Sequence, residues 1–154
     1  MIQLRLLTQT EKKKLINKRA GETKFGEHIK LLSNINNIYE ELNELDVEFV
    51  LFGINEDIGS FANFNATPNL SNWKPILKSV LNLQNNNFTT PEKVAVLGCL
   101  TFEKEQEELL KLNPNKVADT KRARKLVATI DKVISQLVND IVKAGKTPII
   151  ISSN

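Results

Sequence analysis

The residues best placed for chemistry in this sequence are Glu56 and Asp57, which follow a short apolar segment at 47–54. That segment is rich in β-forming residues and predicts a buried strand. In an α/β protein, functional loops follow the carboxyl ends of the strands. Gly53 and Gly59 permit unusual backbone angles around the two acids. The loop therefore predicts ligand orientation or support of a metal site, with solvated acids in a simple turn as the alternative.

Two other reactive residue types occur once each in the chain, as His28 and Cys99. His28 falls in the first turn of a predicted helix, where a half-exposed side chain is expected. Cys99 follows Gly98 at a strand end, a position open to a nucleophile, but no histidine is arranged to activate it. We expect Cys99 to act as a small hydrophobic residue. A metal site needs several converging ligands, and neither Asp-x-His-x-Asp nor His-x-x-His spacing occurs. The sequence thus predicts no catalytic residue and no metal ligand in this chain.

The elements that must position these residues alternate between helix and strand. Apolar residues at helical spacing predict helices over 27–45, from 73 to about 81, over 101–112 and over 117–144. Short apolar runs predict buried strands at 47–54, 93–98 and 149–151. Gly145 suits a left-handed helix C-cap, and Pro148 suits a sheet edge. Residues 1–26 are expected to form an irregular N-terminal segment. Alternating strands and helices imply parallel pairing, so the fold class is α/β: a three-layer α/β/α sandwich whose parallel sheet is truncated to about three strands.

The bulk properties describe an ordinary globular chain of 154 residues with a formal net charge of +3. A lysine cluster at 12–19 lacks interleaved aromatic residues, so no nucleic-acid partner is expected. No stretch approaches the roughly 18 apolar residues of a membrane span, so no membrane partner is expected either. The single cysteine fits a reducing compartment. We expect a cytoplasmic protein.

Four stretches of the sequence resemble the N-terminal part of the ureohydrolase family, which comprises arginases, agmatinases and formimidoylglutamases. The likeness is strongest to the formimidoylglutamase-like branch. The stretches are Gly21-Glu22-Thr23-Lys24-Phe25-Gly26-Glu27-His28, Val50 through Gly59 with Ala62-Asn63, Trp73 through Asn86, and Ala123 through Ile151. The resemblance implies that residues 27–154 form a partial ureohydrolase-like α/β domain. It also implies that Asp57, Gly59 and Asn63 shape a loop near the mouth of the family's active site, without a catalytic role in this chain.

In that family, two Mn²⁺ ions activate a hydroxide that attacks a guanidino or formimino carbon. The metal ligands come from a Gly-Gly-Gly-His loop and from later Asp-x-His-x-Asp and Asp-x-Asp motifs, none of which has a counterpart here. Asn55 stands where the family usually has proline, and residues 64–68 replace a glycine-rich stretch. We therefore expect the N-terminal scaffold of a Mn-dependent hydrolase of linear C–N bonds, such as those of formimidoylglutamate or arginine.

Alone, this scaffold is expected to hold no cofactor and to be inactive. The predicted strand at 149–151 has no catalytic loop after it, so we expect either self-association or a missing C-terminal half as the partner. The alternative is a non-catalytic module that binds itself or another protein. A third possibility, an unrelated activity of Glu56, Asp57 or Cys99, remains open at this point.

Overall fold

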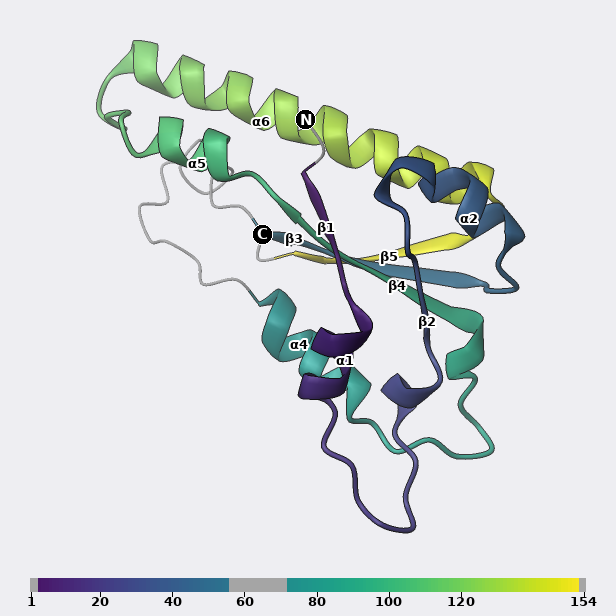
Figure 1. Ribbon diagram of the computed structural model, residues 1–154. Helices are drawn as coiled ribbons and strands as arrows, with labels where there is room; N and C mark the ends of the chain where they lie inside the picture. The colour runs from purple at the N-terminus through teal and green to yellow at the C-terminus, as the bar shows by residue number, and fades with distance from the viewer. Residues whose placement is uncertain (1–2, 56–71, 153–154) are drawn as a thin grey trace.

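The computed structural model describes residues 3–55 and 72–152 (Figure 1). In this part of the chain five strands form one sheet, in the order β1-β4-β3-β5, with β2 also pairing with β4. The strands are β1 (Leu4–Leu6), β2 (Lys30–Leu31), β3 (Phe49–Asn55), β4 (Val94–Thr101) and β5 (Thr147–Ser152). The helices are α1 (Gln9–Leu15), α2 (Ile38–Glu44), α4 (Trp73–Leu81), α5 (Glu103–Leu109) and α6 (Val117–Lys143), with short 3-10 turns η1 (Phe25–Glu27), η2 (Ile35–Asn37) and η3 (Pro91–Lys93).

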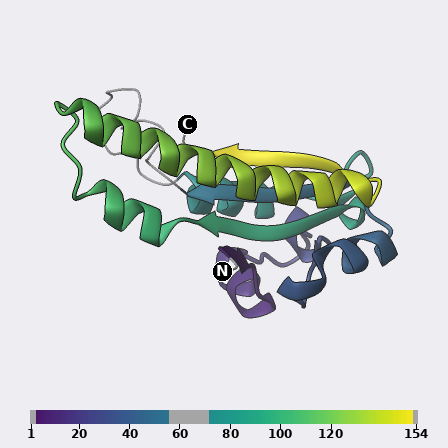
Figure 2. The ribbon, with the colours of Figure 1, turned by 90° about the horizontal axis from the view of Figure 1, so that it is seen from above.

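The helices cover both faces of the sheet, with α2, α5 and α6 on one side and α1 and α4 on the other (Figures 1 and 2). The α6-side core is the larger of two clusters and includes Leu42, Phe52, Leu97, Phe102 and Ile141. The α4-side core includes Ile29, Leu51, Leu77, Leu81 and Val96. The predicted α/β class and layered arrangement are confirmed.

The central strands are parallel, as their alternation with helices predicts. β3 pairs in parallel with β4 on one side and with β5 on the other. β1 is the exception, because it runs antiparallel to β4 and places Arg5 opposite Cys99. The sheet of the described residues is therefore mostly parallel, and it has five strands where the sequence predicted about three.

Both additional strands lie near the N-terminus. Residues 1–26 were expected to be irregular, but β1 and α1 form there. Thr8 caps α1 in a capping box: its hydroxyl accepts from the Glu11 N–H at 3.2 Å, and the Glu11 carboxylate accepts from the Thr8 N–H at 3.1 Å. β1 is only three residues long and depends on β4 for its hydrogen bonds, so its own sequence carries a weak signal.

The predicted helix over 27–45 is wrong in its first half. Only α2 forms there, preceded by β2 and η2. The Glu41 carboxylate accepts from the backbone N–H groups of Ser33 and Asn34, and the Asn34 side chain accepts from the Asn36 N–H at 2.9 Å. These local hydrogen bonds replace those of an α-helix, so the chain forms the short 3-10 turn η2 before α2 begins.

The long helix α6 ends in a Schellman motif, as Gly145 predicts. Gly145 has φ +78°, and its N–H donates to the Val142 carbonyl at 2.9 Å. The N–H of Lys146 donates to the Ile141 carbonyl at 3.1 Å. The reversal directs the chain into β5 beside β3.

β5 is an edge strand of the described sheet, which corrects the expectation that it is buried. Ile149 and Ile150 are each 43% exposed. They pair in register with Leu51 and Phe52, which belong to opposite cores, so the two isoleucines face opposite sides of the sheet. Neither helix layer fully covers β5 in the described residues.

Candidate functional site

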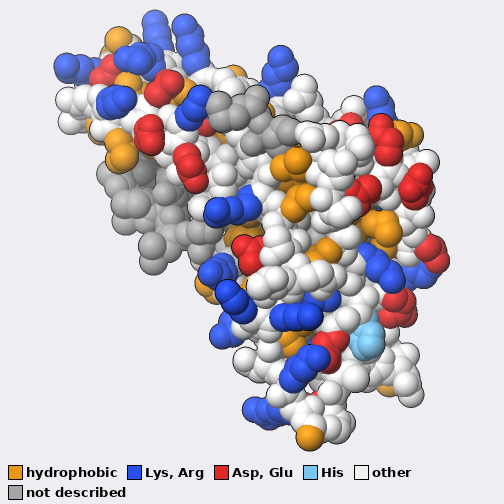
Figure 3. Space-filling model, in the orientation of Figure 1, with side chains coloured by type: hydrophobic (Ala, Val, Ile, Leu, Met, Phe, Trp, Pro, Cys, Tyr) orange, Lys and Arg blue, Asp and Glu red, His pale blue; other side chains and the backbone are white. Residues whose placement is uncertain are grey.

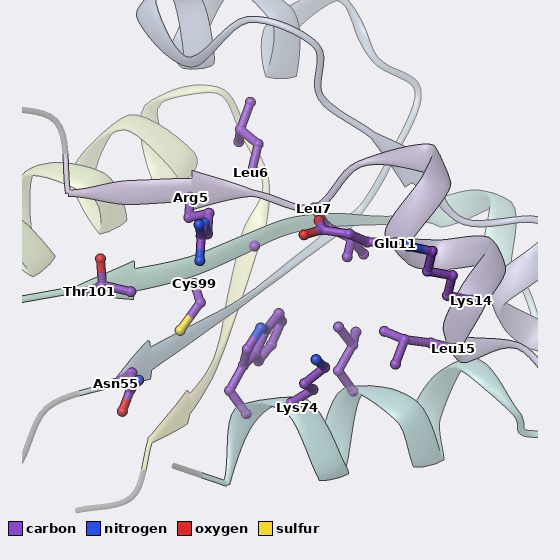
Figure 4. Close-up of a pocket in the computed structure, with 13 residues that line it drawn as sticks. Arg5, Leu6, Leu7, Glu11, Lys14, Leu15, Asn55, Lys74, Cys99 and Thr101 are labelled. Carbon is purple, nitrogen blue, oxygen red and sulfur yellow. The ribbon is translucent and has the colours of Figure 1, made fainter.

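A cavity of about 420 Å³ opens on the α4 side of the sheet, at the carboxyl ends of β3 and β4 (Figure 4). We call it the strand-end cavity. Strands β1, β3 and β4 form one wall, and helices α1 and α4 form the other. Its described lining is Arg5, Leu6, Leu7, Glu11, Lys14, Leu15, Asn55, Trp73, Lys74, Leu77, Gly98, Cys99 and Thr101. This is the edge at which parallel α/β sheets place ligands.

A β-bulge in β4 sets which side chains reach the strand-end cavity. Leu51 pairs with Val96 but the next residue of β3, Phe52, pairs with Gly98, so Leu97 is the extra residue. Leu97 and Leu100 consequently both lie in the α6-side core, although they are three residues apart. The bulge turns Cys99 and Thr101 to the opposite side, into the cavity wall.

Gly98 lets β1 close the cavity. Its φ of +143° is rarely adopted by residues with a side chain, and a Cβ there would lie 2.0 Å from the Arg5 carbonyl oxygen. The N–H of Leu7 donates to the Leu97 carbonyl at 2.8 Å next to this contact. The bulge and the close approach of β1 therefore depend on the same glycine.

Cys99 is the most deeply buried reactive group of the cavity wall, with 8% of its surface exposed. Burial raises the pKa of its thiol to about 11. The Sγ atom lies 3.5 Å from the Leu100 carbonyl, to which the thiol donates. The thiol thus stays protonated at neutral pH and is a poor nucleophile.

Among the described residues that line the strand-end cavity, the charged side chains are mainly cationic. They are Arg5, Lys14 and Lys74, together with one carboxylate, Glu11. The Glu11 carboxylate accepts hydrogen bonds from Thr8, so it is engaged in capping α1. Figure 4 shows the Arg5 and Cys99 side chains extending from adjacent strands toward the same space. The arrangement suits a small anionic group held by Arg5, with a hydrogen bond available from the Asn55 amide, whereas Thr101 donates to the Gln3 carbonyl.

The described residues do not fit a manganese pair. Within them, no three His, Cys, Asp or Glu side chains lie together in a way that could hold a metal ion. His28 is exposed at the end of η1 and does not line the strand-end cavity.

The acidic loop that the sequence singled out lies outside the described residues. This applies to Glu56 and to the three loop residues that the resemblance places near the family's active-site mouth, Asp57, Gly59 and Asn63. Its neighbour Asn55, the last residue of β3, does line the cavity.

Sequence reasoning missed Arg5, Lys14 and Lys74 as cavity residues. The alternation of Leu4, Arg5 and Leu6 was the available signal for β1 and for the direction of the Arg5 side chain. No comparable signal exists for Lys14 and Lys74, because only the packing of α1 beside α4 brings them together.

No family model, no curated protein and no solved structure matches this chain. None of the helices in the described residues is long and apolar enough to cross a bilayer.

Proposed function

We propose that this chain is a scaffold domain of the ureohydrolase type, which supports a binuclear Mn²⁺ hydrolase site without supplying its ligands. The observation that carries the proposal is the parallel arrangement β4-β3-β5 between two helix layers, with a cavity at the carboxyl ends of β3 and β4. This geometry supports the resemblance to the ureohydrolases, because the active site of a parallel α/β protein is expected at the carboxyl ends of its strands. The single histidine of the sequence cannot provide the family's His-containing motifs.

The test is hydrolysis of N-formimidoylglutamate, arginine and agmatine with Mn²⁺ present. The chain alone is expected to release neither ammonia nor urea and to leave the electron paramagnetic resonance signal of free Mn²⁺ unchanged. A second chain carrying the Gly-Gly-Gly-His and Asp-x-His-x-Asp motifs is expected to restore Mn²⁺-dependent turnover when co-expressed with it. Turnover by the chain alone would refute the proposal, and so would a co-expressed pair that associates but stays inactive.

A second candidate function is self-association through β5. The Thr147 N–H donates to the Glu48 carbonyl at 2.8 Å, so the backbone groups of Thr147 face β3. Because successive residues of a strand direct their backbone groups to opposite sides, those of Pro148 and Ile150 point away from β3, toward the open edge. Such an edge, flanked by exposed isoleucines on both faces, can accept another strand. The occupant proposed is β5 of a second copy, related by a twofold axis and therefore antiparallel.

Size-exclusion chromatography with light scattering tests this second function. A dimer is expected at micromolar protein concentrations. A monomer across the accessible concentration range would exclude it, while leaving the scaffold proposal intact.

A further inference from the structure

A second cavity, of about 700 Å³, lies on the other side of α1, between that helix, η1 and β2. We call it the lysine cavity, after Lys12, Lys13, Lys18 and Lys30 in its lining. It shares no lining residue with the strand-end cavity. Figure 3 shows lysine and arginine side chains gathered beside the single histidine on this face of the molecule.

Lys12 is the residue that distinguishes this cavity from a solvated basic surface. Only 7% of Lys12 is exposed, and it is the only charged residue among the buried ones in the described part of the chain. No carboxylate of the described residues lies within 4.0 Å of its ammonium group. Burial lowers the pKa of Lys12, as do its neighbours Lys13 and Lys18, and Glu27 offsets only part of this effect. Most of the Lys12 side chain is buried, but its ammonium nitrogen is not among the fully buried polar atoms that lack a partner, so this partly desolvated cation can pair with an anion that enters the cavity.

The nearby carboxylates are committed elsewhere or exposed. Glu27 accepts from the Lys24 N–H at 2.6 Å and pairs with Lys18 at 3.5 Å. Glu92 lines the cavity but is exposed. Four lysines therefore face two glutamates in this lining, and the excess charge is positive.

The cations of the lysine cavity indicate the kind of anion that it can hold. Among the described lining residues they are lysines, of which Lys12 is buried and Lys13, Lys18 and Lys30 are exposed. Lysine ammonium groups act as point charges, and several of them can be directed at the oxygens of one phosphate, a group that lysine commonly binds. We propose that the lysine cavity binds the phosphate group of a small molecule, with Lys12 as the innermost contact. This inference is independent of the function proposed above.

Isothermal titration of the full chain with inorganic phosphate and with pyrophosphate, at constant ionic strength and pH 7.5, tests the proposal. Saturable binding of one ion per chain is expected. Lys12→Met keeps the aliphatic stem and is expected to weaken binding about tenfold or more, as the loss of a charged hydrogen bond does. The matched control Lys132→Met, on the exposed face of α6, is expected to bind like the wild type. Absence of saturable binding, or equal binding by Lys12→Met, would overturn the proposal.

The thermal midpoint of Lys12→Met and one further variant, Glu27→Gln, separate a binding role from a structural one. Lys12→Met is expected to keep or raise the thermal midpoint without phosphate, because it removes a partly desolvated cation that lies beside Lys13 and Lys18. Glu27→Gln is expected to tighten phosphate binding several-fold, since it removes an opposing charge while its amide oxygen can still accept from Lys24. A lower midpoint for Lys12→Met, combined with unchanged binding by Glu27→Gln, would assign Lys12 a structural role and refute the site.

The source of the phosphate group is distinguished by competition. A nucleoside monophosphate and inorganic phosphate are expected to displace each other at one site. Binding by a single-stranded oligonucleotide alone, with an affinity that falls steeply with salt, would instead indicate a nucleic-acid surface and overturn the small-molecule proposal.

Discussion

The indole of Trp73 lies so close to Gly53 that a Cβ on the glycine would come 2.4 Å from the ring. This contact joins the first residue of α4 to the middle of β3. It also forms part of the strand-end cavity, because Trp73 lines that cavity between the sheet and α4. The missing side chain at position 53 is therefore a packing requirement of the site.

Gly53→Ala is expected to displace the indole and to lower the free energy of unfolding by roughly 1–3 kcal/mol, the usual cost of overpacking. Trp73 is the single tryptophan, so its emission reports the displacement directly. Denaturant unfolding followed by fluorescence measures both effects. In a Trp73→Phe background, followed by circular dichroism, the same glycine substitution should cost less, and an equal cost would contradict the proposed contact.

Gly98→Ala is expected to destabilise the protein more than Gly145→Ala, although both glycines have positive φ. A Cβ at position 98 would strike the Arg5 carbonyl, whereas position 145 has no atom within 4 Å. We expect about 3 kcal/mol or more at Gly98 and about 1 kcal/mol at Gly145. Chemical denaturation of the two variants measures the difference. Equal costs would mean that backbone angle alone, and not the approach of β1, requires Gly98.

Cys99 is expected to resist alkylation in the folded protein at pH 7–8 and to react once the chain unfolds. Its thiol pKa is raised to about 11, above its unfolded value, so its contribution to stability is complete below the unfolded pKa. As pH rises toward 11 the unfolded state loses this proton first, and stability falls by at most about 1.4 kcal/mol per pH unit. Comparison of wild type with Cys99→Ala by thermal unfolding at pH 8 and pH 10 isolates this effect. Rapid labelling of the native protein at pH 7.5 would contradict the burial of the thiol.

Ile150→Lys is expected to shift a β5-mediated dimer toward monomer by at least tenfold in dissociation constant, because charged residues at a sheet edge oppose strand addition. The control is Phe88→Lys, since Phe88 is 96% exposed and lies in the loop between α4 and η3. Light scattering over a concentration series measures both variants. If the two behave alike, association does not involve β5.

The central elements could be predicted from sequence because their signals are local. The apolar runs of β3, β4 and β5 are long enough to specify strands, and the helical periodicity of α6 continues to its glycine stop. The helix expected at 27–45 failed because Leu31 and Ile35 satisfy helical spacing by coincidence. Leu31 instead lies in β2 and pairs with Val96 of β4, and hydrogen bonds from the Ser33 and Asn34 N–H groups to the Glu41 carboxylate fix the backbone that follows.

The strand-end cavity was only partly predictable. Its place at the carboxyl ends of the strands follows from parallel topology, and Asn55 lines it from the end of β3. The side of the sheet that Cys99 and Thr101 face could not be predicted, since alternation through β4 would have sent both to the other core. The exposure of Ile149 and Ile150 could not be predicted either. The sequence of β5 shows that the strand is apolar, but it does not show how much of the strand the helices on each face cover.

The pairing of Gly98 with Phe52 fixes the phase of the second half of β4, so this half is sensitive to length as well as to composition. Many single substitutions in β4 change one contact, but removing Cys99 would exchange the two sides of the sheet for every later residue of the strand. Apolar Leu100 and Phe102 would then face the cationic space, while Thr101 would enter the packed interior. Variation among natural versions of this half of the strand should therefore consist of replacements, with insertions and deletions confined to the bulge or to positions beyond the strand.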